Sequence, residues 1–428
     1  MSRTPYGISL YKTVTDLARP LVPFVLMERA RRNKEDRTRL GERRGEASRA
    51  RPSGPLIWVH GASVGECLSL LPLVDKLVRH DVSVLVTSGT VTSANVLARR
   101  LPEGATHQYI PLDLTLYARR FMDHWRPDLI IFAESEIWPN LLCEASERAI
   151  PIVQVNARLS DRSFRRWRGL QRLAKFLFSR FDLCLAQTQQ DAERLVRLGA
   201  SRVTVTGNLK FDAMPPPAAP LMVSGIEAMI GARPVWLAAS THAGEEAMII
   251  QAHRMIAEQF PDLLTIIAPR HPERGREVAS LVARSGLSVS QRSLGLLPDS
   301  ATDLYVADTI GELGLFYRVA PLVLLGGSLV PHGGQNPIEP AKLGAALLHG
   351  PHVHNFEEVY SAIDAANGAT LVHDSEDLAW AVTRLLTDTA ELRASARRAN
   401  EAVLGVGGAL QRTMAEIAPY LLKMHLGA

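Results

Sequence analysis

Acidic side chains follow two apolar stretches in the first half of the chain, at points where strands would end. Glu66 comes directly after the loop GASVG, and Glu134 and Glu136 follow the apolar run DLIIF. An ionised carboxylate at the edge of a sheet can take a proton from a substrate hydroxyl. A helix N-terminus stabilises such a charge. Glu66 is therefore predicted to be a general base, and favourable helix electrostatics alone is the alternative.

Basic and glycine-rich segments follow the apolar stretches of the second half. Arg270 lies at the end of one of them, in PRHPER. A guanidinium next to backbone N–H groups at a helix start suits a phosphate, with a surface ion pair as the alternative. Gly311, in DTIGELGLFY, would let a ligand approach the backbone closely. The alternative for that stretch is a plain helix start, in which Thr309 and Glu312 form a capping box.

The segment GGSLVPHGGQNPIEPA combines a permissive backbone with a helix-start pattern. Asn336 fits a cap, Pro337 the first helical position and Glu339 the third. A carboxylate at this helix start would also suit the hydroxyls of a nucleotide ribose, and His332 is a candidate substrate contact. We therefore expect the second half of the chain to bind a nucleotide. The first half should bind the acceptor, the substrate whose hydroxyl loses a proton to Glu66. The histidines of HGPHVH lack the spacing of metal ligands, so no metal site is predicted.

Alternating strand-like and helix-like segments must position these side chains. Seven apolar runs lie between residues 55 and 207, and six more follow the proline-rich stretch FDAMPPPAAP. This alternation predicts an α/β fold of two Rossmann-like domains facing a cleft, with ligands at the carboxyl ends of the strands. The predicted division is 1–51, an N-terminal segment; 52–210, the acceptor domain; 211–220, a linker; and 221–428, the nucleotide domain. The last helix, near 409–424, could cap either domain.

Several functional classes lack their sequence signals. The chain has no GxGxxG after a strand, no GxxxxGK[ST] and no Asp-x-Asp. These absences disfavour a dinucleotide dehydrogenase, a P-loop enzyme and a metal-dependent single-domain glycosyltransferase. Its three cysteines are too scattered for a disulfide framework, which indicates a reduced, cytosolic compartment. Two-domain glycosyltransferases and epimerases are the natural candidates.

The positive charge of the chain is concentrated at its N-terminus. Residues 1–51 carry 13 Lys/Arg against 6 Asp/Glu, a net +7 in a chain whose total is +4. The rest of the chain is therefore slightly acidic, and no nucleic-acid partner is expected. The apolar segment ISLYKTVTDLARPLVPFVLM precedes the basic run RARRNKEDRTRLGERR. This order predicts a helix lying on an anionic membrane surface, and the alternative is a docked helix followed by a solvated charged tail.

Six motifs together resemble the signatures of one enzyme family. They are WVHGASVGE, FAESEIWPN, GNLKFD, PRHPER, TIGELGLFY and GGQNPIEPA, in this order. The chain resembles the 3-deoxy-D-manno-octulosonic acid (Kdo) transferases of lipopolysaccharide assembly over nearly its whole length. Gly61 departs from the family pattern, where alanine is expected.

The resemblance implies a fold, a reaction and a set of roles. The fold is the two-domain GT-B arrangement, and the reaction moves Kdo from CMP-Kdo to a glucosamine hydroxyl of a lipid A precursor, releasing CMP without a cofactor or metal. Glu66 would be the general base, and Glu134 a second acidic residue near the reaction centre. The residues placed against CMP are Pro269, Arg270, Gly311, Glu312, Leu313, Asn336, Pro337, Ile338 and Glu339.

The resemblance also implies a location at the cytoplasmic face of the inner membrane, with the N-terminal segment as the anchor. Two rival functions remain. One is a two-domain transferase that uses a UDP-sugar, such as a lipid A disaccharide synthase-like enzyme. The other is a non-catalytic nucleotide-binding protein that docks on membranes.

Overall fold

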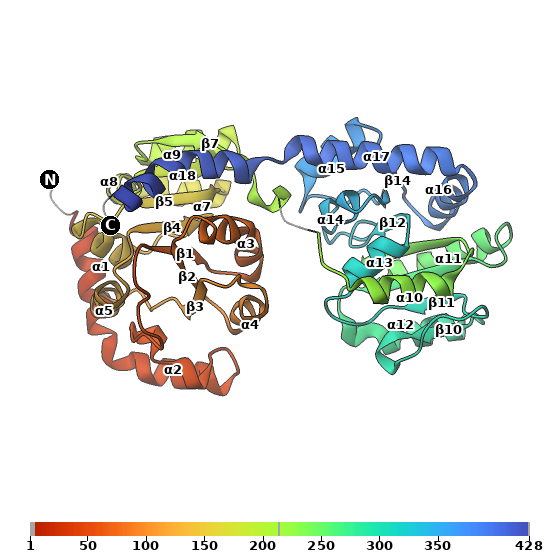
Figure 1. Cartoon of the computed structure of the whole chain (residues 1–428), viewed down its shortest axis with the longest axis horizontal. Coiled ribbons are helices and arrows are strands. Elements are labelled where there is room, and N and C mark those ends of the chain that lie inside the picture. Colours follow the sequence, from red (N-terminus) through yellow and green to blue (C-terminus); the bar gives the residue numbers. More distant parts are fainter. Residues whose placement is uncertain (1–4, 213–214, 427–428) are drawn as a thin grey trace. The chain divides into compact units, whose positions relative to one another are not determined.

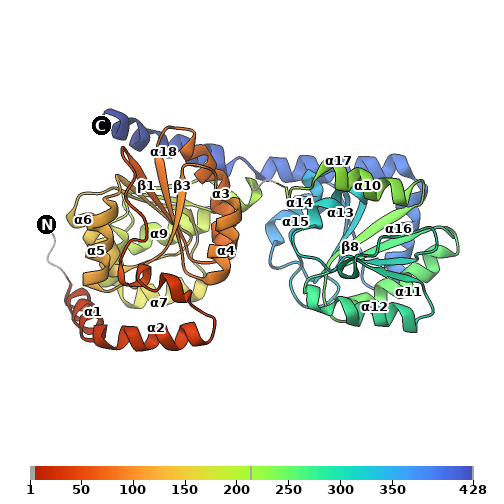
Figure 2. The same ribbon diagram turned by 60° about the horizontal axis from the view of Figure 1, so that its bottom comes forward.

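Two parallel β-sheets of seven strands organise the chain, one in each of two structural units (Figure 1). They are taken from a computed structural model that describes residues 5–212 and 215–426. The first unit takes the chain up to residue 213 together with 407–428, and the second takes 214–406. Each sheet lies between layers of helices (Figures 1 and 2). The predicted α/β class of two Rossmann-like units is confirmed.

The first sheet has the strand order β3-β2-β1-β4-β5-β6-β7. Its strands are β1 (Leu56–Gly61), β2 (Ser83–Ser88), β3 (Ala105–Tyr109), β4 (Leu129–Ala133), β5 (Ile152–Ala157), β6 (Leu183–Ala186) and β7 (Val203–Val205). The central strands β1, β4, β5 and β6 are buried on both faces, as is typical of parallel sheets, whereas the edge strands β3 and β7 are only partly buried. Within β1, Ile57 and Val59 belong to one core cluster and Leu56 and Trp58 to the other.

Helices cover both faces of this sheet. Helices α5, α6, α8 and α9 and Ile8 of α1 pack on one face, and α3, α4 and α18 pack on the other. Figure 2 shows α1 and α2 along one side of the unit. The helices are α1 (Tyr6–Leu17), α2 (Val22–Arg31), α3 (Val64–Val78), α4 (Val91–Arg100), α5 (Thr115–Trp125), α6 (Pro139–Glu147), α7 (Asp161–Gly169), α8 (Gln171–Phe178), α9 (Gln189–Leu198) and α18 (Ala409–Leu426).

The second sheet has the order β10-β11-β9-β8-β12-β13-β14. Its strands are β8 (Val235–Thr241), β9 (Leu264–Pro269), β10 (Val289–Gln291), β11 (Leu304–Val306), β12 (Leu322–Leu325), β13 (Ala346–His349) and β14 (Ala369–Leu371). Its helices are α10 (Pro220–Ile230), α11 (Glu245–Ala257), α12 (Gly275–Arg284), α13 (Leu313–Val319), α14 (Ile338–Lys342), α15 (Glu357–Ala365), α16 (Ser375–Thr387) and α17 (Thr389–Val406). The short edge strand β10 was not expected from the sequence.

The last helix differs from the predicted division, which placed 221–428 in one domain. Helix α18 belongs to the first unit, because its apolar side, with Ile417 and Leu421, joins the core cluster under α3. Asp212, at the end of the short helix η4 (Leu209–Asp212), accepts hydrogen bonds from the backbone N–H groups of Gly408 and Leu410 at 2.7 and 2.5 Å. The chain thus returns to the unit in which it began.

Candidate active site

Glu66 lies in the first turn of α3, immediately after β1. Its Oε2 accepts the backbone N–H of Ala62 at 2.9 Å, and its Oε1 accepts the hydroxyl of Ser63 at 2.7 Å. Ser63 is the N-cap residue and accepts the N–H of Glu66 in return. The carboxylate therefore stabilises the helix start, as the alternative interpretation required. It is also partly exposed, and its two oxygens offer about four acceptor sites, so it can still receive a proton.

Glu66 and Glu134 follow the two strands between which the strand order reverses. The strands β1 and β4 are neighbours, but their chain continues in opposite directions across the sheet. Loops after such strands diverge and leave a crevice in which open α/β sheets bind their ligands. The structure thus places both predicted acidic residues at the position in this sheet where a substrate is most expected.

Glu134 forms an ion pair that the sequence did not reveal. Its Oε1 lies 2.9 Å from Nζ of Lys210, and its backbone adopts a left-handed conformation with φ 50°. Lys210 belongs to η4, which is held at the end of β5 by a hydrogen bond of 2.9 Å from the Leu209 N–H to Asn156 Oδ1. The only sequence signal for Lys210 was its place in the motif GNLKFD, which assigns it no role.

The carboxylate of Glu136 contacts neighbouring side chains. Its Oε2 accepts the indole N–H of Trp138 at 2.8 Å and lies 3.6 Å from Nε2 of the buried His60. The Nδ1 atom of His60 is within hydrogen-bond distance of both the carbonyl and the hydroxyl of Thr87. Of the three acidic residues in this region, Glu136 is therefore the one whose carboxylate contacts the ring nitrogens of Trp138 and His60.

In the second unit, Arg270 follows directly after Pro269, the last residue of β9. Its backbone N–H donates to Thr241 O at 2.9 Å, while its side chain is exposed and has no ion pair within the described part of the chain. Arg274 differs, because it is bound by Glu246 at 2.7 Å and by Glu277 at 3.0 Å, and these hydrogen bonds raise its pKa. Arg270 is thus the arginine available to an anionic ligand.

Histidines gather beside Arg270. The rings of His242 and His332 are stacked with centroids 4.2 Å apart, and His271 lies 6.0 Å from His242. Burial and these basic neighbours lower the pKa of His242. The side-chain amide nitrogen of Gln335 lies 3.2 Å from Nε2 of His242 and can only donate there, so Nε2 is the acceptor.

A buried carboxylate that sequence reasoning missed organises the loops after β8 and β12. Glu245 is fully buried at the start of α11. It accepts the backbone N–H groups of His242, Gly327, Ser328 and Leu329 at 2.8 to 3.1 Å. Burial raises the pKa of Glu245, and the N–H donors oppose that shift. These bonds fix the backbone at His242 and in the segment 327–329, which leads to His332.

Gly311, Glu312 and Leu313 form the turn that leads into α13. Gly311 has φ 87° and is exposed. Arg292 binds both carboxylate oxygens of Glu312, at 2.7 and 3.0 Å, and this lowers the pKa of Glu312. The capping box considered for Thr309 and Glu312 does not form, because Glu312 itself is the N-cap and lacks a side-chain cap bond. A ligand at this turn would therefore meet backbone groups and no free carboxylate.

Asn336, Pro337, Ile338 and Glu339 lead into the short helix α14 after β12. Asn336 Oδ1 accepts the N–H of Ile338 at 3.0 Å, and the helix begins at Ile338, one residue later than predicted. The three segments placed against a nucleotide thus follow β9, β11 and β12, so they come after the carboxyl ends of strands in a single parallel sheet. Among the described residues, no three His, Cys, Asp or Glu side chains gather in a way that could hold a metal ion.

The N-terminal helices expose an apolar surface. No helix in the described ranges is long and apolar enough to cross a membrane. On α1, Ile8 faces the core, whereas other apolar side chains face solvent. The exposed apolar residues of α1, α2 and their connection are Tyr6, Leu10, Val14, Leu17, Leu21, Phe24, Val25 and Met27.

Helix α7 exposes a basic surface on the same side of the sheet as α1. Phe164 and Trp167 pack against the core cluster that also contains Ile8. The arginines of α7 and its flanks are exposed and form no ion pair with any carboxylate that the structure describes. They are Arg158, Arg162, Arg165, Arg166, Arg168 and Arg172.

The chain is similar to known proteins in sequence and in fold. The sequence profile of the family described as "3-Deoxy-D-manno-octulosonic-acid transferase (kdotransferase)" matches residues 38–213. The 3-deoxy-D-manno-octulosonic acid transferase of Haemophilus influenzae is 33% identical over 96% of this chain and 98% of its own. That of Bordetella pertussis is 34% identical over 94% and 96%. Among solved structures, a UDP-GlcNAc 2-epimerase from Neisseria meningitidis shares the fold, with a TM-score of 0.55 and 16% identity over 86% of this chain and all of that one.

Proposed function

The chain belongs to the family of 3-deoxy-D-manno-octulosonic acid transferases, which are glycosyltransferases, and from this premise we propose its substrates and site. The donor is CMP-Kdo, and the acceptor is a glucosamine hydroxyl of a lipid A precursor. The acceptor binds the first unit at the loops after β1 and β4, and the CMP moiety binds the second unit. The observation that carries the proposal is a partly exposed carboxylate, Glu66, at the point where the strand order reverses.

The proposed transfer moves one proton, forms one bond and breaks another. Glu66 takes the proton of the acceptor hydroxyl, whose oxygen forms the new bond to the anomeric carbon of Kdo. The bond between that carbon and the phosphate oxygen of CMP breaks, and CMP leaves with the electron pair. The ion pair of Glu134 and Lys210 lies at the neighbouring strand ends. We propose that the ammonium group of Lys210 stabilises the negative charge that develops during transfer, because a cation held in place before the reaction stabilises such a charge most effectively.

The donor assignment rests on the groups at one edge of the second sheet. Arg270 supplies an exposed guanidinium, which forms no ion pair with any carboxylate in residues 5–212 and 215–426, for the single phosphate of CMP. The turns 311–313 and 336–339 supply backbone groups and the carboxylate of Glu339 for the nucleoside. Donor selectivity tests this assignment: we expect release of CMP from CMP-Kdo in the presence of acceptor and no turnover of UDP-sugars. Turnover of a UDP-sugar with none of CMP-Kdo would favour the rival transferase.

A membrane surface is the proposed setting of the reaction, on the cytoplasmic side of the inner membrane. The exposed apolar residues of α1 and α2 would enter the headgroup region, and the arginines of α7 would contact anionic phosphates. Both surfaces lie on the same side of the sheet, since Ile8, Phe164 and Trp167 pack on one core cluster. We therefore assign both to peripheral binding.

Flotation with vesicles separates the two contributions. Phe24→Ser should reduce binding to neutral and anionic vesicles alike, whereas Arg165→Gln combined with Arg166→Gln should reduce binding only to vesicles rich in phosphatidylglycerol. Leu294→Ser is the matched control, because Leu294 is 65% exposed on the second unit. Equal binding by the control and the Phe24 variant would contradict the assignment of α2.

A further inference from the structure

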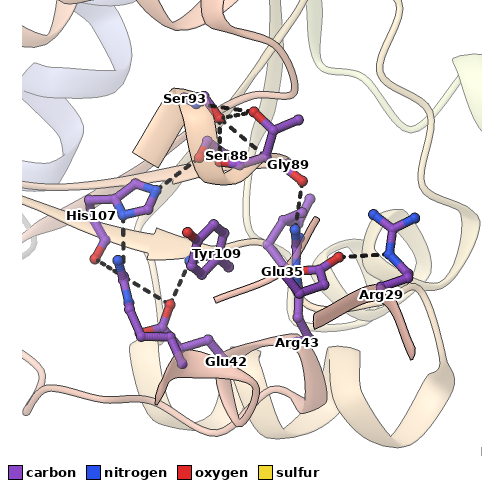
Figure 3. A network of polar contacts seen from close by, with 12 residues as sticks. Arg29, Glu35, Glu42, Arg43, Ser88, Gly89, Ser93, His107 and Tyr109 are labelled. Atoms are coloured by element: carbon purple, nitrogen blue, oxygen red, sulfur yellow. Dashed lines mark hydrogen bonds and ion pairs between the residues drawn. The ribbon is translucent and has the colours of Figure 1, made fainter. Parts of the chain in front are cut away.

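The charged run that follows α2 is partly buried. Glu35 and Arg43 form an ion pair at 2.9 Å in which their side chains are only 3% and 5% exposed. The other oxygen of Glu35 lies 2.9 Å from Nε of Arg29 on α2 (Figure 3). Only part of this segment is therefore the solvated tail or membrane-facing cluster considered from the sequence.

Arg43 holds the ends of two strands. Its Nη2 donates to the carbonyl of Gly89 at 2.6 Å, just after β2, and its Nη1 donates to the carbonyl of Ile110 at 3.1 Å, just after β3. Its guanidinium also lies over the ring of Tyr109, 4.8 Å from the centroid. Figure 3 shows Arg43 pointing from the N-terminal segment toward Gly89. Three of its nitrogens are thus used, each toward a different partner.

The contacts continue from Gly89 to the proposed base. The N–H of Gly89 donates to Ala62 O at 3.1 Å, and the N–H of Ala62 donates to Glu66 Oε2 at 2.9 Å. The fit between these two loops is close, since a Cβ atom on Gly89 would lie 2.8 Å from Ala62 O. A displacement of Gly89 is therefore transmitted to the backbone that binds the Glu66 carboxylate.

A buried ion pair is weak grounds for stability, because desolvation of both charges offsets their attraction. An apolar side chain of similar volume could fill the space of Arg43. It would leave the carbonyls of Gly89 and Ile110 without their donor, whereas the planar guanidinium fixes both in one geometry. The arrangement therefore suits a residue that holds the loops after β2 and β3 in a fixed position.

We infer that Arg43 is a positioning residue for Glu66, and that Glu35 links it to α2, the helix proposed to lie on the membrane. The inference rests on the proposed function, since it gives Glu66 the role of base. Arg43 does not touch the substrate in this account. It acts through Gly89 and Ala62 on the orientation of the carboxylate.

Arg51 provides a matched control in the same unit. It too binds backbone carbonyls, those of Trp125 and Pro52 at 2.8 Å each, but near the opposite ends of β1 and β4. Arg43→Met should lower kcat by about 10- to 100-fold, the effect of a small misplacement of a catalytic group, and leave CMP affinity within twofold. Arg51→Met should leave kcat within twofold while lowering the melting temperature.

A double-mutant cycle gives a readout that a merely structural role would not move. If Arg43 acts through Glu66, Arg43→Met should cost nothing further in a Glu66→Gln background. Arg43→Lys, which keeps the charge but has a single donor group, should lie between Arg43→Met and the native protein. Should Arg43→Met fail to fold, Glu35→Gln undergoes the same measurements, with a smaller loss of kcat expected.

Equal kcat values for Arg43→Met and Arg51→Met would overturn the inference, as would additive losses in the cycle. Failure of the native protein to transfer Kdo would instead overturn the proposed function. The two failures are therefore distinguishable in one set of assays.

Discussion

Replacement of Glu66 by glutamine separates the two roles that this carboxylate can have. The amide oxygen of the new side chain can still accept the N–H of Ala62, which Glu66 now accepts at 2.9 Å. The amide nitrogen can donate to Ser63 Oγ in place of the present bond of 2.7 Å. The cap is therefore retained, but the group can no longer take a proton.

The expected magnitudes differ widely for the two roles. Loss of a positioned general base lowers kcat by about 10²- to 10⁴-fold, which corresponds to about 3–5 kcal/mol in the barrier. Retention of the cap limits the change in the free energy of unfolding to about 0.5 kcal/mol, below the ~1 kcal/mol typical of replacing a capping residue by alanine. If Glu66 served only as a cap, the glutamine variant would be nearly native in both respects.

Single-turnover transfer with saturating CMP-Kdo measures the first quantity, and chemical denaturation the second. Asp374→Asn is the control, because Asp374 caps α16 with hydrogen bonds of 2.9 Å to the N–H groups of Glu376 and Asp377. That variant should keep its rate. A Glu66→Gln protein with kcat within threefold of the native value would refute the assignment of the base.

Three further predictions concern neighbouring groups. Arg270→Ala should weaken CMP binding by about 1.5–3 kcal/mol, the size of a charge-assisted hydrogen bond, in calorimetry, whereas Arg274→Ala should lower the melting temperature of the protein with CMP affinity nearly unchanged. Lys210→Met should lower kcat by about 10- to 1,000-fold with CMP affinity intact, and Lys210→Arg should recover part of the loss. Burial, reinforced by two neighbouring arginines, lowers the pKa of His107 to about 3, against about 6.5 when unfolded. Between pH 6.5 and pH 3 the unfolded chain binds a proton on His107 that the folded chain does not. The free energy of unfolding should therefore fall as the pH drops, by about 3 kcal/mol at pH 4. Chemical denaturation of His107→Gln should lack this dependence on pH.

The sequence predicted the elements that local patterns define. All thirteen apolar runs expected to be strands are strands, because buried parallel strands are nearly continuous apolar segments. The strand β10 (Val289–Gln291) escaped notice because its three residues are only partly buried. The place of α18 also could not be predicted, since it depends on Asp212 and on which core its apolar side joins. That choice is made in three dimensions and leaves no local pattern.

The positions of the candidate residues could be predicted where a residue stands at the end of a strand, whereas their roles stay predictions. Glu66, Glu134 and Arg270 follow β1, β4 and β9 as predicted, because parallel strands bring their carboxyl ends to the same end of a sheet. The ion pair of Lys210 and the backbone contacts of Glu245 could not be predicted, since they involve partners distant in sequence or backbone groups. Arg43 was hidden in a basic run in which exposed and buried arginines look alike.

The most direct test of the account is a transfer reaction with freshly generated CMP-Kdo and a tetra-acylated lipid A precursor, followed by mass spectrometry. We predict a product heavier than the acceptor by whole Kdo residues, with CMP released in equal number, and the mass difference will give the number of residues added. An unchanged acceptor mass, with folded protein and intact donor, would contradict the proposed reaction.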